Sequence, residues 1–227
     1  MGEWRELATP QGPVRAWHAH PDRPARGGVV VLQEIFGVNP YIRALAGRFA
    51  RAGFSALAPA LFDVLRPQVE LGYDDAGVAR GRELASELGF DAAVAIAGAA
   101  TRWLHEAGHR VGVVGFCWGG SVAFLCNTRL GLPAVGYYGA RSLPFLDEQG
   151  VEGRPRAPLM FHFGGRDASI PPEDIALHRE KQPHAAIHVY PEAGHAFDRD
   201  VDPRVHDPEA AALAWRRTID FLAAALQ

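Results

Sequence analysis

Residues 111–120 constrain the fold of this chain more than any other part of its sequence. Their valine-rich beginning predicts a buried strand of a mostly parallel sheet, and the apolar spacing of residues 121–126 predicts a helix directly afterwards. Cys117 stands in the turn between them, with Gly115 and Gly119 two residues to either side. Strand and helix approach closely at such a strained turn, so both flanking positions must lack bulky side chains. The turn presents the cysteine sulfur at a helix N-terminus, where the helix dipole favours a thiolate.

Two interpretations of this motif are open. A Gly-x-nucleophile-x-Gly turn between strand and helix is the nucleophile elbow of the α/β-hydrolases, here with cysteine in place of serine. The alternative is a buried cysteine beside a glycine-rich turn, because free cysteine is often a small core residue. The five residues alone do not decide between them, so the remainder of the chain has to.

Length and charge exclude several classes of function. A chain of 227 residues is large enough to bury a core, and we expect one α/β domain over residues 1–227. The formal net charge of −3 and the lack of basic runs argue against partners such as nucleic acid or a membrane surface. No apolar run reaches the roughly 18 residues of a membrane span. The ten histidines include no HExxH motif and no Cys/His cluster, so no metal site is predicted.

The cysteines bear on the compartment of the protein. Cys117 and Cys126 are the two in the chain, and nine residues along one helix separate them by roughly 13 Å. A disulfide needs Cα atoms within about 7 Å, so both thiols are expected to be free. Free thiols, together with an N-terminal sequence that lacks the apolar core of a signal peptide, predict a reducing, cytoplasmic location.

Short apolar runs alternate with segments of helical spacing along the chain. Strands are expected at residues 14–19, 28–32, 54–58, 111–116, 133–138, 159–163 and 186–190. Helices are expected from residue 40 to Gly53, and at about 75–88, 91–105, 121–126, 172–182 and 207–226. There are no internal repeats and no linker-like stretch. This alternation predicts an α/β fold with a doubly wound, mostly parallel sheet and helices on both faces.

In open sheets of this kind, ligands lie beyond the carboxyl ends of the strands. Three expected strand ends carry chemistry, at Cys117, Asp167 and His195, in the nucleophile–acid–histidine order of α/β-hydrolases. His195 would take the thiol proton and later protonate the leaving group, while Asp167 would fix its tautomer and orientation. The sequence leaves Asp174 and Glu173 as alternatives for the acid, and it allows Asp167 to be a turn-capping residue.

From about Val29 to the last helix, the chain resembles the dienelactone hydrolases, or carboxymethylenebutenolidases. The motifs that carry the resemblance lie at residues 33–39 (QEIFGVN), 115–120 (GFCWGG), 136–139 (GYYG), 164–167 (GGRD) and 194–197 (GHAF). The resemblance implies the α/β-hydrolase fold, no cofactor, and hydrolysis of a dienelactone to an oxo-dicarboxylic acid in chlorocatechol breakdown. It also implies a triad of Cys117, Asp167 and His195.

Further site residues follow from the same resemblance. Glu34 matches a carboxylate that family members hold against the thiol, and Arg80 and Arg199 match two arginines that grip the substrate carboxylate. The backbone N–H groups of Ile35 and Trp118 match the oxyanion hole; for Trp118 the elbow itself predicts this role, because the residue after the nucleophile donates. On the residues alone, Glu34 is a loop carboxylate and Arg80 one of several basic residues on a helix.

Some positions depart from the family pattern. Leu84 and Glu87 stand where the best-known members have pocket aromatics, and Ala196 follows the histidine where those members have serine. Trp118 is bulkier than the leucine often found beside the nucleophile. These differences leave the mechanism intact and leave the exact substrate open.

The predicted function is a cofactor-free hydrolase that cleaves a small carboxylate-bearing lactone or ester through an acyl-thioenzyme. Its partner would be that small anionic substrate, and a monomer is compatible with the sequence. The alternatives are a broad-specificity carboxylesterase and a non-catalytic small-molecule binder or thiol sensor on the same fold. A binding module would not need Cys117, Asp167, His195 and Glu34 together, which favours an enzyme. Whether residues 59–75 close over the site is open.

Overall fold

The computed structural model describes residues 2–148, 150–154 and 156–227. The chain divides into two compact units, residues 1–113 with 226–227 (unit 1) and residues 114–225 (unit 2). Strand β5 (Val111–Phe116) has residues in both units. The expectation of a single domain over residues 1–227 therefore stays a prediction.

Unit 1 is built on four strands in the order β1-β2-β4-β3. They are β1 (Gly2–Leu7), β2 (Val14–Ala19), β3 (Gly28–Leu32) and β4 (Ser55–Pro59). β1 and β2 form an antiparallel hairpin, β2 pairs antiparallel with β4, and β3 pairs parallel with β4. Every residue of β3 and β4 is buried, which explains why both strands read as continuous apolar runs.

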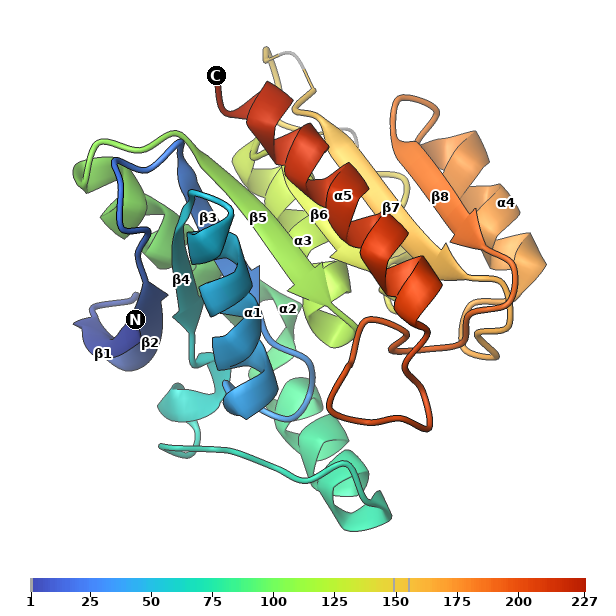
Figure 1. Ribbon diagram of the computed structural model, residues 1–227, viewed down its shortest axis with the longest axis horizontal. Coiled ribbons are helices and arrows are strands. Elements are labelled where there is room, and N and C mark those ends of the chain that lie inside the picture. The colour runs from blue at the N-terminus through green and yellow to red at the C-terminus, as the bar shows by residue number, and fades with distance from the viewer. Residues whose placement is uncertain (1, 149, 155) are drawn as a thin grey trace. The chain divides into compact units, whose positions relative to one another are not determined.

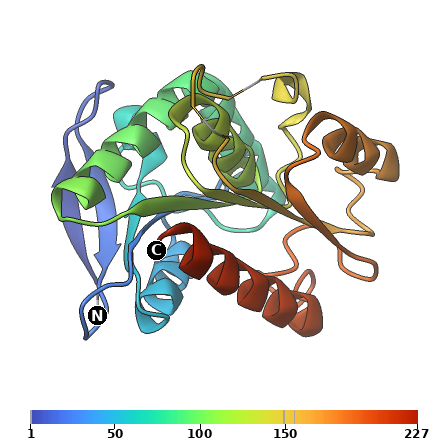
Figure 2. The same ribbon diagram turned by 90° about the horizontal axis from the view of Figure 1, so that it is seen from above.

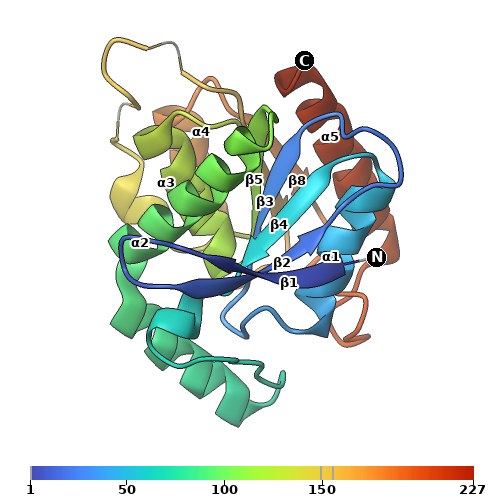
Figure 3. The same cartoon turned by 90° about the vertical axis from the view of Figure 1, so that its left-hand side faces the viewer.

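Two helices of unit 1, α1 (Pro40–Arg51) and α2 (Asp75–Glu106), lie on opposite sides of β3 and β4 (Figure 1 and Figure 3). The start of α1 is the expected one. The Asn39 side chain accepts a hydrogen bond from the Ile42 N–H at 3.2 Å, and proline occupies the first turn. A short 3-10 helix, Leu61–Val64, follows β4.

Helix α2 contains the break that the sequence predicts. Gly89 has φ 72° and ψ 167°, a conformation that glycine adopts readily, and it separates the two helical segments. The second segment thus starts just after Gly89, slightly before the expected start at Asp91. Among the described residues, α2 is the one helix long and apolar enough to cross a membrane, but 61% of its apolar window is buried, as in the core helix of a globular protein.

Unit 2 contains the end of β5 and the remaining strands, in the order β5-β6-β7-β8, with β6 parallel to β7 and β7 parallel to β8. The strands after β5 are β6 (Ala134–Tyr137), β7 (Leu159–Gly164) and β8 (Ala186–Tyr190). The helices are α3 (Trp118–Leu130), α4 (Pro172–Lys181) and α5 (Pro208–Ala225), with a 3-10 turn at Leu143–Phe145. Helix α5 covers one face of these strands, and α3 and α4 cover the other (Figure 2).

The turn between β5 and α3 depends on glycine. A Cβ atom on Gly115 would lie 1.9 Å from the backbone oxygen of Gly119, and one on Gly120 would lie 2.7 Å from that of Tyr137. Cys117 itself has φ 53° and ψ −120°, in the left-handed range that non-glycine residues rarely adopt. The helix therefore begins immediately after Cys117, three residues earlier than expected, because the elbow turns the chain within one residue.

This close approach makes a stability prediction. Gly115→Ala should lower the free energy of unfolding by about 3 kcal/mol or more, because the clash is with backbone that cannot move aside. Gly47→Ala in α1 is the matched control. Its Cβ would meet only the flexible Arg51 Nη1, at 3.5 Å, so helix propensity should raise the free energy of unfolding by about 0.5–1 kcal/mol. Urea denaturation measures both, and equal stabilities would refute the packing argument.

Candidate active site

Unit 2 brings together the three residues expected to form a triad. His195, in the loop after β8, has its Nε2 3.2 Å from the Sγ of Cys117 and its Nδ1 2.6 Å from Oδ2 of Asp167. Asp167 lies in the turn after β7. Of the three candidate acids, Asp167 makes this contact, whereas Glu173 and Asp174 lie in the first turn of α4.

Two glycines allow the acid turn and the histidine loop to meet. A Cβ atom on Gly164 would lie 2.6 Å from the backbone oxygen of Ala193, and one on Gly165 would lie 2.7 Å from that of Pro191. The Gly165 N–H also donates to the Tyr190 carbonyl at 2.7 Å. The Gly-Gly pair of the 164–167 motif thus lets the backbone that carries Asp167 pack directly on the backbone before His195.

Partial burial and charge set the protonation of the pair. Burial raises the pKa of the Asp167 carboxyl, but hydrogen bonds from His195 and Ser169 and the charge of His195 outweigh it, so the pKa lies below its usual range. Burial lowers the pKa of His195, while the negative charge of a Cys117 thiolate and the bonds to Asp167 and Cys117 raise it to about 10. The imidazole in this site therefore holds a proton to higher pH than a free histidine does.

Two neighbours of the triad were not predicted from the sequence. The Ser169 hydroxyl lies 2.5 Å from Oδ1 of Asp167 and 3.2 Å from Nδ1 of His195, and its N–H donates to the same Oδ1 at 2.9 Å. The Asp-x-Ser spacing was a usable signal, because an aspartate often bonds the backbone two residues on. The Tyr138 ring packs 5.1 Å from that of His195, with φ 40° at Tyr138, which no local pattern indicated.

The other expected residues of unit 2 lie near these loops in the chain. Arg199 is buried, its N–H donates to the Ala196 carbonyl at 2.9 Å, and its Nη1 lies 3.8 Å from Oδ2 of Asp202. Ala196 has φ 62°, so the residue after the histidine is in the left-handed region without being glycine. Trp118 is the first residue of α3 and is buried, which places its backbone at the helix N-terminus as the elbow predicts.

Unit 1 holds the remaining expected residues at the carboxyl end of β3. Glu34 is fully buried and Ile35 is partly exposed. A Cβ atom on Gly81 would lie 2.3 Å from the Ile35 carbonyl oxygen, so the first turns of α2 pack directly on this loop. Arg80, next to Gly81, donates from its Nη1 to Glu83 at 2.8 Å, and its side chain is partly exposed. Unit 1 therefore collects Glu34, Ile35 and the helical turn of Arg80 in one region.

The segment before α2 supports the same loop. The Phe36 and Tyr73 rings meet edge to face at 4.8 Å, and the Asn39 amide donates to the Tyr73 hydroxyl at 2.9 Å. A Cβ atom on Gly37 would lie 1.9 Å from the Val69 carbonyl oxygen, so only glycine fits there. Residues 69–73 thus pack against the loop after β3 in the structure.

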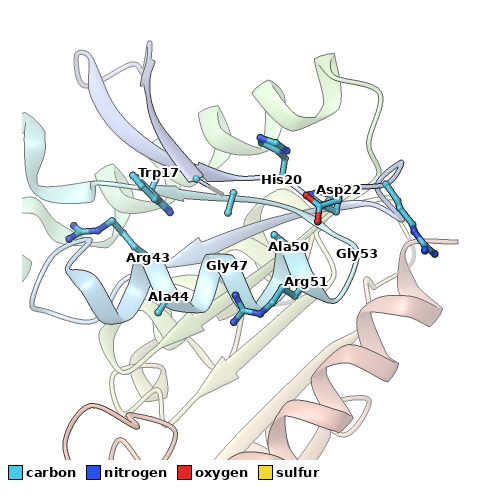
Figure 4. A pocket seen from close by; sticks show the side chains of 13 residues that line it. Trp17, His20, Asp22, Arg43, Ala44, Gly47, Ala50, Arg51 and Gly53 are labelled. Atoms are coloured by element: carbon cyan, nitrogen blue, oxygen red, sulfur yellow. The ribbon is translucent and has the colours of Figure 1, made fainter.

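A separate cleft of about 570 Å³ lies between α1 and the end of β2 (Figure 4). Trp17 and Arg43 line one end of it, and Gly47 and Arg51 line its α1 side. None of the expected site residues lines this cleft. Within the part of the chain that the structure describes, no group of three or more His, Cys, Asp or Glu side chains could hold a metal ion.

The sheet is mostly parallel and lies between helices. Its strand ends carry an elbow with Cys117, an acid after β7 and a histidine after β8. This combination defines an α/β-hydrolase. A model of the dienelactone hydrolase family matches residues 14–226. The chain belongs to the dienelactone hydrolase family, which confirms the resemblance found in the motifs, and it is an ester or lactone hydrolase.

Individual relatives agree with this assignment. The carboxymethylenebutenolidase of Pseudomonas putida is 36% identical over 208 residues, covering 86% of this chain and 84% of the relative. Carboxymethylenebutenolidase 1 of Cupriavidus pinatubonensis is 34% identical over 208 residues, with 86% and 85% covered. A Klebsiella pneumoniae structure described as a dienelactone hydrolase superposes with a TM-score of 0.86 at 27% identity, covering 98% of each chain.

The pair of His195 and Asp167 makes a pH prediction. Asp167→Asn removes a charge that raises the pKa of His195, so that pKa should fall from about 10 toward the ordinary 6.5. A raised pKa contributes stability that is present below pH 6.5 and is lost as the pH rises through about 10, so the variant should show less of this loss. NMR titration of the His195 ring measures the shift. Ser169→Ala is the control and should shift the pKa much less; an unchanged titration in Asp167→Asn would contradict the analysis.

Proposed function

We propose that this enzyme hydrolyses a small, carboxylate-bearing, dienelactone-like lactone or ester through an acyl-thioenzyme on Cys117, without a cofactor. The observation that carries the proposal is the pair of contacts made by His195, 3.2 Å to Cys117 Sγ and 2.6 Å to Asp167 Oδ2. They combine a nucleophile, a proton carrier and an orienting acid in one line of hydrogen bonds.

The first half of the reaction follows from these contacts. The Cys117 thiolate attacks the carbonyl carbon, and the oxyanion that forms is stabilised by the Trp118 N–H at the helix N-terminus, with the Ile35 N–H as the second donor expected from the family. The intermediate collapses, the carbon–oxygen bond of the lactone breaks, and the His195 imidazolium gives its proton to the departing oxygen. In a lactone that oxygen stays attached as an enol or alcohol of the acyl-enzyme.

The second half returns the enzyme to its starting state. Neutral His195 removes a proton from water, and the resulting hydroxide attacks the thioester carbon. The carbon–sulfur bond breaks, the carboxylic acid leaves, and Cys117 is again a thiolate beside the His195 imidazolium. Asp167, held by Ser169, keeps the ring oriented in both halves.

We propose Arg80 and Arg199 as the groups that bind the substrate carboxylate. Arg199 is buried, and its Nη1 lies 3.8 Å from Oδ2 of Asp202. On α2, Leu84 is buried and Glu87 is exposed. Neither side chain is aromatic, whereas the best-known members have aromatic pocket residues at these positions. The ring substituents accepted are therefore expected to differ from theirs, and a lactone and ester panel separates a dienelactone hydrolase from a broad carboxylesterase.

We also propose a reducing compartment, the cytoplasm, for this enzyme. A thiolate at Cys117 is open to oxidation, and in an oxidising compartment the reaction would lose its nucleophile.

The nucleophile prediction compares the two cysteines. Cys117→Ala should lose essentially all lactone turnover, whereas Cys126→Ala should keep most of it, because Cys126 is fully buried and burial raises its pKa to about 12. Steady-state kinetics with a lactone that bears a carboxylate measure both. Turnover retained in Cys117→Ala would refute the proposed mechanism, and no turnover by the unaltered enzyme across the panel would favour the thiol sensor.

The arginine prediction separates charged from neutral substrates. Arg80→Ala and Arg199→Ala should each cost on the order of 2–5 kcal/mol in kcat/KM for anionic lactones, while a neutral ester such as nitrophenyl acetate is hydrolysed almost as before. Lysine should restore little, because its point charge does not reproduce bidentate binding. Equal losses on both substrate types would mean that the arginines only support the fold.

Glu34 is proposed, on the family resemblance, to hold the Cys117 thiol by a hydrogen bond until an anionic substrate displaces it. Glu34 then takes the thiol proton and leaves Cys117 paired with His195. The structure has Cys117 Sγ beside His195, which is the arrangement proposed for the activated state. Glu34→Gln should therefore keep the fold, lose lactone turnover and change the pH dependence of Cys117 alkylation by iodoacetamide. Unchanged turnover and alkylation in this variant would leave activation of the thiol to His195 alone.

A further inference from the structure

A buried polar network joins α5 to the strands of unit 2. Helix α5 lies on the opposite face of these strands from α3 and α4 (Figure 2). At its centre is His162 of β7, which is fully buried and bonded through both ring nitrogens. Its Nδ1 lies 2.9 Å from the Tyr190 hydroxyl of β8, and its Nε2 lies 3.0 Å from the Thr218 hydroxyl of α5. The Thr218 hydroxyl also lies 2.7 Å from the hydroxyl of Tyr137 on β6. The network thus joins three strands to one helix.

The direction of these hydrogen bonds follows from Arg217. Its Nη1 donates to the Tyr190 hydroxyl oxygen at 3.2 Å, and a guanidinium has no acceptor. The hydrogen of the Tyr190 hydroxyl is then directed to Nδ1 of His162. Burial lowers the pKa of His162 well below its usual range, with the charges of His188 and Arg217 acting in the same direction. The ring is therefore neutral, with its proton on Nε2, which donates to Thr218.

The backbone carbonyls of Tyr137 and Tyr190 accept hydrogen bonds from the loops that hold Cys117, Asp167 and His195. The Tyr137 carbonyl accepts from the N–H of Cys117 at 3.0 Å. The Tyr190 carbonyl accepts from the N–H of Gly165 at 2.7 Å, in the turn that carries the acid, and from that of Ala193 at 3.2 Å, in the loop that carries the histidine. The His162 imidazole thus bonds the side chain of Tyr190 directly and that of Tyr137 through Thr218. These two tyrosines anchor the three loops of the proposed triad.

A second path runs from His162 to the catalytic histidine. The His162 carbonyl accepts from the N–H of Tyr138 at 2.8 Å, and the Tyr138 ring packs against that of His195 at 5.1 Å. The Phe197 ring lies 5.3 Å from Tyr138 and 5.0 Å from Tyr190, and so fills the space between the two paths. His162 therefore bonds the backbone of Tyr138, which has a positive φ, as well as the side chain of Tyr190.

We infer that His162 is a positioning residue for the reaction: by fixing Tyr190 directly and Tyr137 through Thr218, it sets the distance between Cys117 Sγ and His195 Nε2. The inference rests on the proposed function, because the distance matters only if those two groups react together. Directional bonds suit this task better than apolar contacts, since a fully bonded buried network specifies one arrangement of its strands. An error of about 1 Å in such a geometry can cost about a hundredfold in rate.

The experiment removes each hydroxyl that bonds His162 while keeping the size and shape of the side chain that carries it. Tyr190→Phe and Thr218→Val remove the hydroxyls that bond His162, and each should lower kcat by about tenfold to a hundredfold with little change in KM. Thr218→Ser keeps the hydroxyl and should restore most of kcat. In Tyr190→Phe, the titration of His195 observed by NMR should also move from its wild-type midpoint, because the loop that holds its ring is released.

His188→Gln is the matched control. His188 is the neighbour of His162 in register on β8, and their rings stack at 5.6 Å. Within the described residues it makes no hydrogen bond to this network, so kcat and the His195 titration should stay at wild-type values. His162→Gln tests the centre directly, and Tyr190→Phe keeps the inference testable if that variant does not fold.

The outcomes separate this inference from the proposed function. If Cys117→Ala abolishes turnover but Tyr190→Phe and Thr218→Val keep wild-type kcat and His195 titration, with only their melting temperatures lowered, the network is structural and the inference is wrong. If Cys117→Ala retains turnover, the proposed function fails. The shift of the His195 titration in Tyr190→Phe then still decides whether the network positions that ring.

Discussion

The backbone contact between the end of β5 and the start of α3 is the constraint on which the site depends. Gly115 and Gly119 approach within a distance that no side chain could occupy, and the chain reverses at a strained Cys117. Because the strain is confined to one residue, the sulfur stands clear at a helix N-terminus. The requirement for small residues in this turn therefore serves the proposed reaction as well as the fold.

The loops after β7 and β8 meet the elbow through contacts of the same kind. Gly164 and Gly165 remove the side chains that would keep the acid turn away from the histidine loop, and the Tyr190 carbonyl binds N–H groups from both. Hydrogen bonds and charge then hold a proton on His195 between Asp167 and Cys117. Backbone packing sets the positions, and electrostatics sets the protonation.

Burial of polar groups has two different consequences in unit 2. Cys126, without a hydrogen-bonding role in the mechanism, is fully buried and its raised pKa leaves it a neutral core residue. His162 is equally buried, and burial lowers its pKa and keeps it neutral, but both of its ring nitrogens are hydrogen-bonded. The two side chains thus differ in their hydrogen-bond partners and not in their degree of burial, and these partners are the basis for the positioning role proposed for His162.

The sequence alone determined the order of strands and helices, the break near Gly89, the elbow, and the three strand ends that carry Cys117, Asp167 and His195. These are local patterns, set by apolar period, glycine and capping residues within a few positions. Only the tertiary structure decided that Asp167, and not Asp174, contacts His195, and only it showed Ser169, Tyr138 and the His162 network beside the triad. Those contacts join residues far apart in the chain, so they depend on strand register and side-chain packing, which no local pattern specifies.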